Sequence, residues 1–141
     1  MNKLILISLL SVLARGVAAQ QPASDTVHIP AAAERIVLPE HPYHMSEGDF
    51  YDYQRAYGLS NGQTLRLYSR GFAMFARVDN EQQHRLVAAS ANSFVAMDRQ
   101  LKVRIDLGPN DSVGGELVMV VPATPLAGGG AGERLLVASF H

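Results

Sequence analysis

The feature that most constrains the fold of this chain is an alternation of apolar and polar residues with a period of two. It is clearest in Leu101–Leu107, where Leu, Val, Ile and Leu alternate with Lys102, Arg104 and Asp106. Successive side chains of a β-strand point to opposite faces, so this segment predicts a strand with one buried face and one solvated face. A sheet with one solvated face is typical of antiparallel strands.

Short runs with the same character recur along the chain and are separated by turn signals. Asn61-Gly62 predicts a two-residue hairpin turn, because both residues tolerate positive φ. After it, the run from Phe72 to Asp79 places Phe72, Met74, Ala76 and Val78 on one face, and further runs span 84–89, 93–97, 116–121 and 135–140. We therefore expect an all-β, mainly antiparallel fold, a small meander barrel or sandwich of about seven strands.

One short N-terminal helical turn is expected before the first hairpin. Ser46-Glu47-Gly48-Asp49 matches the S-x-x-[DE] capping box, in which a Ser side chain and an acidic side chain satisfy free N–H groups at a helix start. Periodicity does not define where this helix ends, because the aromatic residues that follow fit both helix and strand spacing. We predict a helical turn to about Asp52 and then a strand.

The first nineteen residues have the organisation of a signal peptide. Lys3 precedes an apolar run from Leu4 to Leu13, and the small residues 17–19 form an A-x-A-like cleavage site. The run is too short to span a bilayer, so no membrane span is expected after signal cleavage. We predict three segments: a signal peptide (1–19), a flexible N-terminal arm (20–34) and a single β domain (35–141). The protein is expected to be periplasmic or secreted.

Charge and cysteine content limit the function classes. The chain has 12 Lys+Arg against 13 Asp+Glu; without Lys3 and Arg15 of the leader, ten cations face thirteen acids, a formal charge of −3. Nucleic-acid binding requires a concentrated cationic surface, so no nucleic-acid partner is expected. The chain has no cysteine, which excludes disulfides and thiolate chemistry.

A resemblance extends over residues 35–106. The segment RIVLPEHPYHMSEGDFYDYQRAYGLSNGQTLRLYSR, with FARVD and SFVAM after it, resembles a set of small exported proteobacterial proteins that share an R-I-x-L-P…M-x-x-x-[DE]-F…Y-x-L-S-N-G-x-x-L pattern and have no assigned activity. More distantly, its hairpin is similar to the accessory β domain at the C-terminus of β-lactamase-like hydrolases. The resemblance implies an exported β domain and brings no functional residues with it.

Two sets of residues are candidates for a binding surface. Tyr43, Tyr51 and Tyr53 lie in an aromatic-rich entry segment, and exposed tyrosines bury a large area at low entropic cost. The alternative is that Phe50 and Tyr57 close the core while the other rings stay half exposed.

The second candidate set lies on predicted outward strand faces. Arg66, Tyr68 and Arg70 would form a cationic stripe with Lys102 and Arg104 if their two strands lie near each other. The alternative is an ordinary solvated face on which long cations discourage edge pairing.

Catalytic and metal-binding patterns are weak. Gly58-Leu59-Ser60-Asn61-Gly62 fits G-x-S-x-G, but a nucleophile elbow needs a strand-turn-helix context, and here a strand pattern follows. His41 and His44 are candidate metal ligands, although zinc sites need three or four ligands. We expect no catalytic residues and no cofactor.

Three function classes follow from these expectations. The first is a non-enzymatic cell-envelope module that binds an envelope component, either protein or polysaccharide. The second is a small β-barrel that encloses an apolar ligand among Phe72, Met74, Phe94 and Met97. The third is an enzyme with scattered site residues or a His-based metal-binding protein, and a cleft that joins His84 to an acid would favour it.

Overall fold

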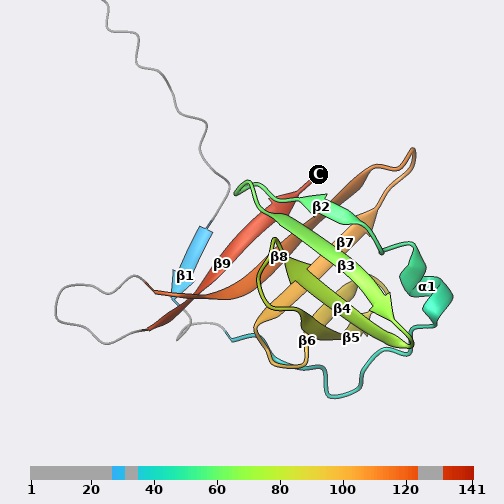
Figure 1. Cartoon of the computed structure of the whole chain (residues 1–141), viewed down its shortest axis with the longest axis horizontal. Helices are drawn as coiled ribbons and strands as arrows, with labels where there is room; N and C mark the ends of the chain where they lie inside the picture. Colours follow the sequence, from blue (N-terminus) through green and yellow to red (C-terminus); the bar gives the residue numbers. More distant parts are fainter. Residues whose placement is uncertain (1–26, 31–34, 124–131) are drawn as a thin grey trace, which may run out of the picture.

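The computed structural model describes residues 27–30, 35–123 and 132–141, and the predicted signal peptide (1–19) lies outside them. It confirms the all-β antiparallel class, with one short helix (Figure 1). The elements are β1 (Val27–Pro30), α1 (Glu47–Tyr51), β2 (Ala56–Gly58), β3 (Thr64–Arg70), β4 (Ala73–Val78), β5 (His84–Ser90), β6 (Ser93–Ala96), β7 (Leu101–Leu107), β8 (Val113–Pro122) and β9 (Glu133–Phe140).

The described strands form one sheet, in which sequence neighbours from β2 to β9 are spatial neighbours and β1 pairs with β9. Its order is β1-β9-β8-β7-β6-β5-β4-β3-β2, and each pairing is antiparallel. The predicted meander is therefore correct, and the nine strands are close to the expected seven. One difference concerns the arm predicted to be flexible (20–34), because Val27–Pro30 forms β1 and pairs with Arg134–Val137 of β9.

Strands β2 to β9 curl until the two ends of the meander meet. Ser60, just after β2, donates its backbone N–H to the carbonyl oxygen of Ser139 on β9 at 2.8 Å. The Ser139 N–H donates in turn to the Ser60 hydroxyl at 3.2 Å. These two hydrogen bonds nearly close an eight-stranded barrel. Ser60 therefore lies where the two ends of the meander meet.

The barrel interior is filled by the inward residues of the alternating strands. Leu101, Val103 and Ile105 are fully buried, as their alternation predicts, whereas Leu107 at the strand end is 41% exposed. Phe72 was expected on the buried face of β4, but it is 97% exposed because it lies in the turn before that strand begins. Other residues that fill the interior include Leu65, Leu67, Ala76, Val78, Leu86, Ala88, Phe94, Ala96, Leu117, Ala138 and Phe140.

The turn at Asn61-Gly62 differs from the prediction. Leu59 N–H donates to the Gln63 carbonyl oxygen at 2.8 Å, so three residues separate the closing pair. Only Gly62 takes a positive φ, of 84°, as in a type I turn followed by a glycine bulge. Asn61 keeps a negative φ, and its side-chain Nδ2 donates to Gln63 Oε1 at 2.7 Å. The two-residue prediction was wrong because sequence alone does not define the closing pair.

The capping box is confirmed at α1. The Ser46 hydroxyl accepts from the Asp49 N–H at 3.1 Å, and Asp49 Oδ2 accepts from the Ser46 N–H at 3.0 Å. The Ser46 hydroxyl also donates to Asp49 Oδ2 at 2.7 Å, and this bond, together with the one from the Ser46 N–H, holds the pKa of the exposed Asp49 carboxyl below its ordinary value. The helix places Phe50 in the core, where its ring meets Phe94 edge-on at 5.4 Å.

A segment ahead of α1 covers part of the outer barrel surface. Ile36 is buried against Val95 and Leu135, which point out of the barrel. Farther along, the Tyr43 N–H donates to the carbonyl oxygen of Ala88 at 2.8 Å. Residues 35–45 therefore cover an apolar part of the outer surface that would otherwise be exposed to solvent.

Candidate functional site

The most distinctive surface is a group of arginine and aromatic side chains on the outer faces of β3, β4 and β5. We call it the arginine–aromatic face. The register places Arg66 opposite Arg77, Tyr68 opposite Phe75, and Phe75 opposite Arg85. Together with Arg70, these residues alternate with the buried residues of the same strands, so they project outward.

The two aromatic rings form the centre of this face. Tyr68 and Phe75 stack with ring centroids 5.8 Å apart and an interplanar angle of 18°. The Arg70 guanidinium lies over both rings, with its Cζ 5.7 Å from the Tyr68 centroid and 5.9 Å from that of Phe75. The Tyr68 hydroxyl donates to Gln83 Oε1 at 2.8 Å, which fixes the ring. The result is a rigid, half-buried aromatic platform with a stacked cation.

The arginines of this face are not neutralised by carboxylates. Within the described residues, the ion pairs closer than 4.0 Å are His84–Asp98 and Arg104–Asp106, and neither includes an arginine of the face. Arg77 Nε is also buried without a hydrogen-bond partner. Like charges that are directly opposite on neighbouring strands are destabilising, so the Arg66–Arg77 pair reduces the stability of the sheet.

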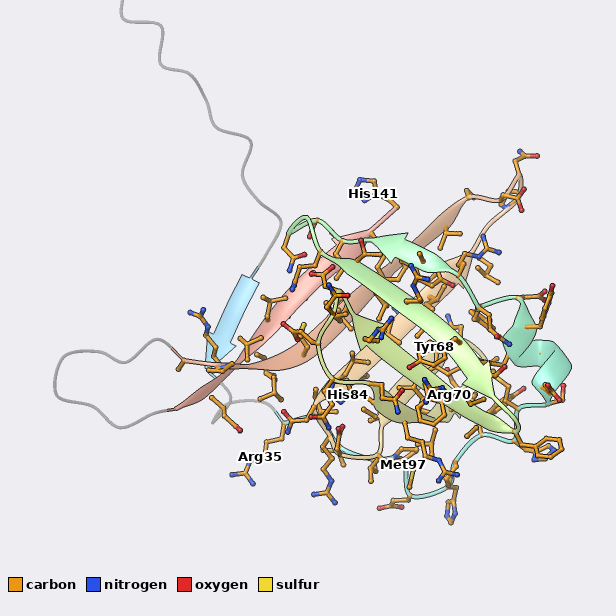
Figure 2. All side chains as sticks on the ribbon, in the orientation of Figure 1. Arg35, Tyr68, Arg70, His84, Met97 and His141 are labelled. Carbon is orange, nitrogen blue, oxygen red and sulfur yellow. The ribbon has the colours of Figure 1, made fainter. Side chains whose placement is uncertain are left out.

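Figure 2 shows Tyr68 and Arg70 at the strands that face the viewer, β3 and β4. The arginine–aromatic face is continuous because β3, β4 and β5 are consecutive strands of the sheet. Its arginines supply planar hydrogen-bond donors beside an aromatic platform, a combination suited to anionic groups on a ring-containing ligand.

The predicted stripe that joined this region to Lys102 and Arg104 does not form. Those residues lie on β7, and three strands separate β7 from β3. Lys102 and Arg104 line a separate groove of about 280 Å³ with Arg35 and Glu116. Arg104 also pairs with Asp106, with Nη1 3.3 Å from Oδ2, and lies opposite Glu116. Arg104 in this second region is therefore paired with acids, as cations on an ordinary solvated face often are.

The tyrosines of the entry segment do not form one platform. Tyr43 is 48% exposed and Tyr51 is 73% exposed, whereas Tyr53 packs edge-on against Phe94 at 5.2 Å. The Tyr53 hydroxyl donates to the Ala91 carbonyl oxygen at 2.9 Å, and Tyr57 is buried. Of the predicted binding residues, the structure brings Arg66, Tyr68 and Arg70 into one surface.

The histidines are distributed over different parts of the molecule. His41 and His44 are exposed, and within the described ranges no group of three or more His, Cys, Asp or Glu is placed to hold a metal ion. His84 lies at the start of β5, where its Nδ1 is 2.7 Å from Asp98 Oδ2. This pair links two neighbouring strand ends, and it lines neither the groove beside Lys102 nor the cleft described next.

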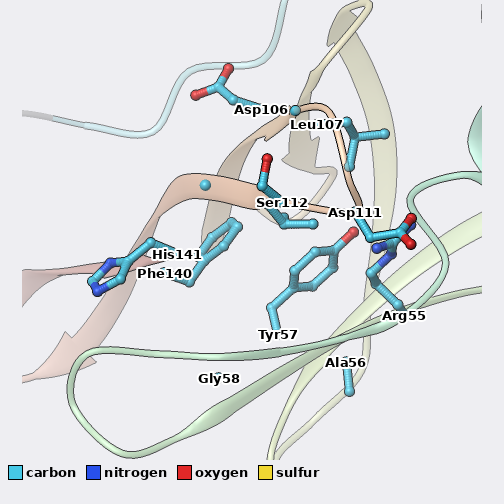
Figure 3. A pocket seen from close by; sticks show the side chains of 13 residues that line it. Arg55, Ala56, Tyr57, Gly58, Asp106, Leu107, Asp111, Ser112, Phe140 and His141 are labelled. Carbon is cyan, nitrogen blue, oxygen red and sulfur yellow. The ribbon is translucent and has the colours of Figure 1, made fainter.

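An open cleft of about 670 Å³ lies at one end of the barrel (Figure 3). Tyr57 and Phe140 form its floor, with ring centroids 5.1 Å apart, and Arg55, Asp111 and Ser112 lie around it. Burial raises the pKa of Tyr57 to about 12. The Tyr57 hydroxyl donates to the Tyr53 carbonyl oxygen at 2.7 Å, so it serves a structural hydrogen bond.

The residues expected to enclose an apolar ligand do not surround one cavity. Phe94 is fully buried within the packed interior, whereas Phe72 and Met97 are exposed at opposite ends of different strands. The interior position expected for a ligand is thus occupied by side chains.

Sequence reasoning missed three members of the arginine–aromatic face, namely Phe75, Arg77 and Arg85. Each alternates with an inward residue, so the same period-two pattern could have identified them as outward. Their assembly around Tyr68 depends on the β3–β4 and β4–β5 registers, which are tertiary information.

Comparison with known proteins does not identify a family: no family model, curated protein or solved structure matches the chain. Among the described residues, no helix has the length and apolar character that crossing a bilayer requires.

Proposed function

We propose that this protein is an exported, non-enzymatic module of the cell envelope that binds an anionic polysaccharide through its arginine–aromatic face. The observation that carries the proposal is the clustering of four arginines around the Tyr68–Phe75 stack without a paired carboxylate among the described residues. The export of the chain rests on its leader-like N-terminus.

The charge of the partner follows from the arginines. Arg66 and Arg77 oppose each other across two strands, an arrangement that disfavours folding. An anion bound between them would relieve the repulsion and use their planar donor groups. The remainder of the mature chain is acidic overall, so the face would also orient an approaching anionic polymer.

The polysaccharide class follows from the aromatic centre. Tyr68 and Phe75 form a partly exposed aromatic stack, in which the Tyr68 hydroxyl is bonded to Gln83 and the Arg70 guanidinium lies over both rings. Sugar rings offer apolar C–H faces that pack on such a surface, and carboxylate or phosphate substituents would reach the surrounding guanidinium groups. An anionic saccharide chain matches both features of the face.

Isothermal titration calorimetry with polygalacturonate as the anionic probe and dextran as the neutral one tests the proposal. We expect binding to polygalacturonate, weaker binding at higher salt, and no binding to dextran. The double variant Arg66→Gln/Arg77→Gln should lose about tenfold or more in affinity, because each charge-assisted contact contributes about 1 kcal/mol or more.

The matched control is Lys102→Gln/Arg104→Gln, which removes the same charge from the outer face of β7. Its affinity should stay within about twofold of the wild type, since only non-specific attraction is reduced. Equal losses in the two double variants, or equal binding of dextran and polygalacturonate by the wild type, would contradict the proposal.

A further inference from the structure

One row of residues on the outer surface of the barrel consists of valines and a single lysine. The registers of four neighbouring strand pairs give this row as Val87, Val95, Lys102, Val118 and Val137. Residues that lie directly opposite each other in an antiparallel sheet share a face, and Val95 and Val118 belong to the apolar cluster outside the barrel. Lys102 therefore carries the charge of an otherwise apolar row, and it is exposed.

The groove of about 280 Å³ lies beside this row, between the segment ahead of α1 and the sheet. Its lining includes side chains from that segment and from β7, β8 and β9, namely Arg35, Ile36, Val37, Lys102, Val118 and Leu135. Ile36 is buried against Val95 and Leu135, so it holds the segment against the sheet. Val37, the next residue, is 71% exposed. The groove thus offers apolar side chains from two sides, and cations lie among them.

The cations of the groove outnumber its acids. Arg35, Lys102 and Arg104 line it with one acid, Glu116. Arg104 contacts Asp106 and lies opposite Glu116, so acids already meet its charge. Among the residues that the structure describes, no ion pair within 4.0 Å includes Arg35 or Lys102. These two cations are therefore available to an anion in the groove.

We propose that this groove binds a small amphiphilic anion, namely a carboxylate that carries an unbranched apolar tail. The carboxylate would accept hydrogen bonds from Arg35 and Lys102, which are charge-assisted and therefore strong. The tail would lie along Val118 and Leu135 and remove apolar surface from water. The groove is slightly smaller than the pockets of about 300–1,000 Å³ that hold drug-sized ligands, so a chain of about eight carbons is a suitable probe.

An amphiphilic anion matches the lining better than a purely polar or a purely apolar ligand does. A small polar anion would use the cations and leave the apolar side chains in contact with water. A neutral apolar ligand would take water away from Arg35 and Lys102 without replacing it by an acceptor, which is unfavourable. Figure 2 shows Arg35 well apart from Tyr68 and Arg70, so the groove is separate from the arginine–aromatic face. Either proposal can fail without affecting the other.

Amide NMR titration of the ¹⁵N-labelled full chain at constant ionic strength tests the proposal with three probes. Octanoate carries both the charge and the tail, octan-1-ol carries only the tail, and acetate carries only the charge. Octanoate should shift the amides of Ile36, Lys102 and Val118 and bind at least about tenfold more tightly than either other probe. This ratio is expected because each buried methylene improves affinity by about two- to fourfold and a charge-assisted contact adds a similar factor or more.

Two variants separate the contributions of the charge and of the apolar surface. Lys102→Gln keeps a polar side chain but removes the charge, so it should weaken octanoate binding about fivefold or more and leave octan-1-ol binding unchanged. Val118→Thr replaces a methyl group by a hydroxyl in a side chain of the same shape. It should weaken octanoate and octan-1-ol binding alike, by about two- to threefold, and leave acetate binding unchanged.

Arg55→Gln is the matched control, because it removes an exposed cation that does not line the groove. Its affinity for octanoate should stay within about twofold of the wild type, since only long-range attraction changes. Equal affinities for octanoate and octan-1-ol, or for octanoate and acetate, would overturn the proposal. Shifts centred outside the groove, or no binding at about 10 mM octanoate, would overturn it as well.

Discussion

Replacement of Arg66 by glutamate should stabilise the protein while it removes anion binding. Arg66 lies directly opposite Arg77 on the solvated side of β3 and β4, so the wild-type pair is repulsive. Arg66→Glu converts it into a pair of opposite charges without a change in the buried residues of either strand. Stability and binding should therefore respond in opposite directions to one substitution.

The magnitude follows from the cross-strand geometry. An opposite-charge pair contributes about 0.2–1 kcal/mol in an antiparallel sheet, and a like-charge pair is destabilising by a similar amount. The free energy of unfolding should therefore rise by about 1 kcal/mol, which raises the Tm of a domain of this size by about 4 °C. The gain should shrink in 1 M NaCl, because exposed charges are screened there.

Arg104→Glu is the matched control, since it applies the same charge reversal on β7. Arg104 contacts Asp106 at 3.3 Å and lies opposite Glu116, so glutamate at this position meets two acids. The Tm should fall by a few degrees instead of rising. Both variants would be compared with the wild type by thermal circular dichroism and by polygalacturonate titration. A lower Tm for Arg66→Glu in low salt would refute the repulsion argument and remove the reason for treating the face as a binding surface.

Three further predictions concern the barrel itself. The pKa of Tyr57 is raised to about 12, so its contribution to stability is complete below pH 10 and is lost as the pH rises toward 12. In Tyr57→Phe, the alkaline loss of unfolding free energy should be smaller by about 1–2 kcal/mol after allowance for solvent screening. A pH profile of urea unfolding that is the same in this variant and the wild type would contradict the prediction. Val103→Asp places a carboxyl in the fully buried core and should cost about 4 kcal/mol, so a Tm near that of the wild type would show that the barrel interior is not packed as described. Gly62→Val imposes a φ of 84° on a β-branched residue and should cost about 1–2 kcal/mol, whereas a neutral result would contradict the glycine-bulge turn.

The sequence predicts well which strand residues point into the core, because the direction of each side chain follows from the local alternation along the strand. Leu101, Val103 and Ile105 are buried where their alternation places them, and Phe94 and Leu117 follow the same logic. The prediction fails where a strand ends. Phe72 and Leu107 continue the apolar alternation of β4 and β7 but lie at the points where the chain leaves the sheet, so neither is buried.

The candidate site was predictable only in part because it depends on relations between strands. Arg66 and Tyr68 could be identified as outward residues of one strand. Their neighbours Phe75, Arg77 and Arg85 required the register of two hairpins, and that register is defined by turns whose length the residues alone left open. Lys102 and Arg104 were grouped with Arg66 by sequence pattern, although three strands separate them in the sheet.

The contrast between the two charged faces supports the proposal that the arginine–aromatic face binds an anion. A solvated sheet face needs only polar groups, and on β7 the chain balances Arg104 with Asp106 beside it and Glu116 opposite it. On β3 and β4 of the same sheet, the chain places arginine opposite arginine and leaves Arg77 Nε without a partner. Since the balanced arrangement would be the more stable one, local departures from stability of this kind are expected at functional sites. A bound anion would offset the repulsion between Arg66 and Arg77, and the arginine–aromatic face would then be as stable as the outer face of β7.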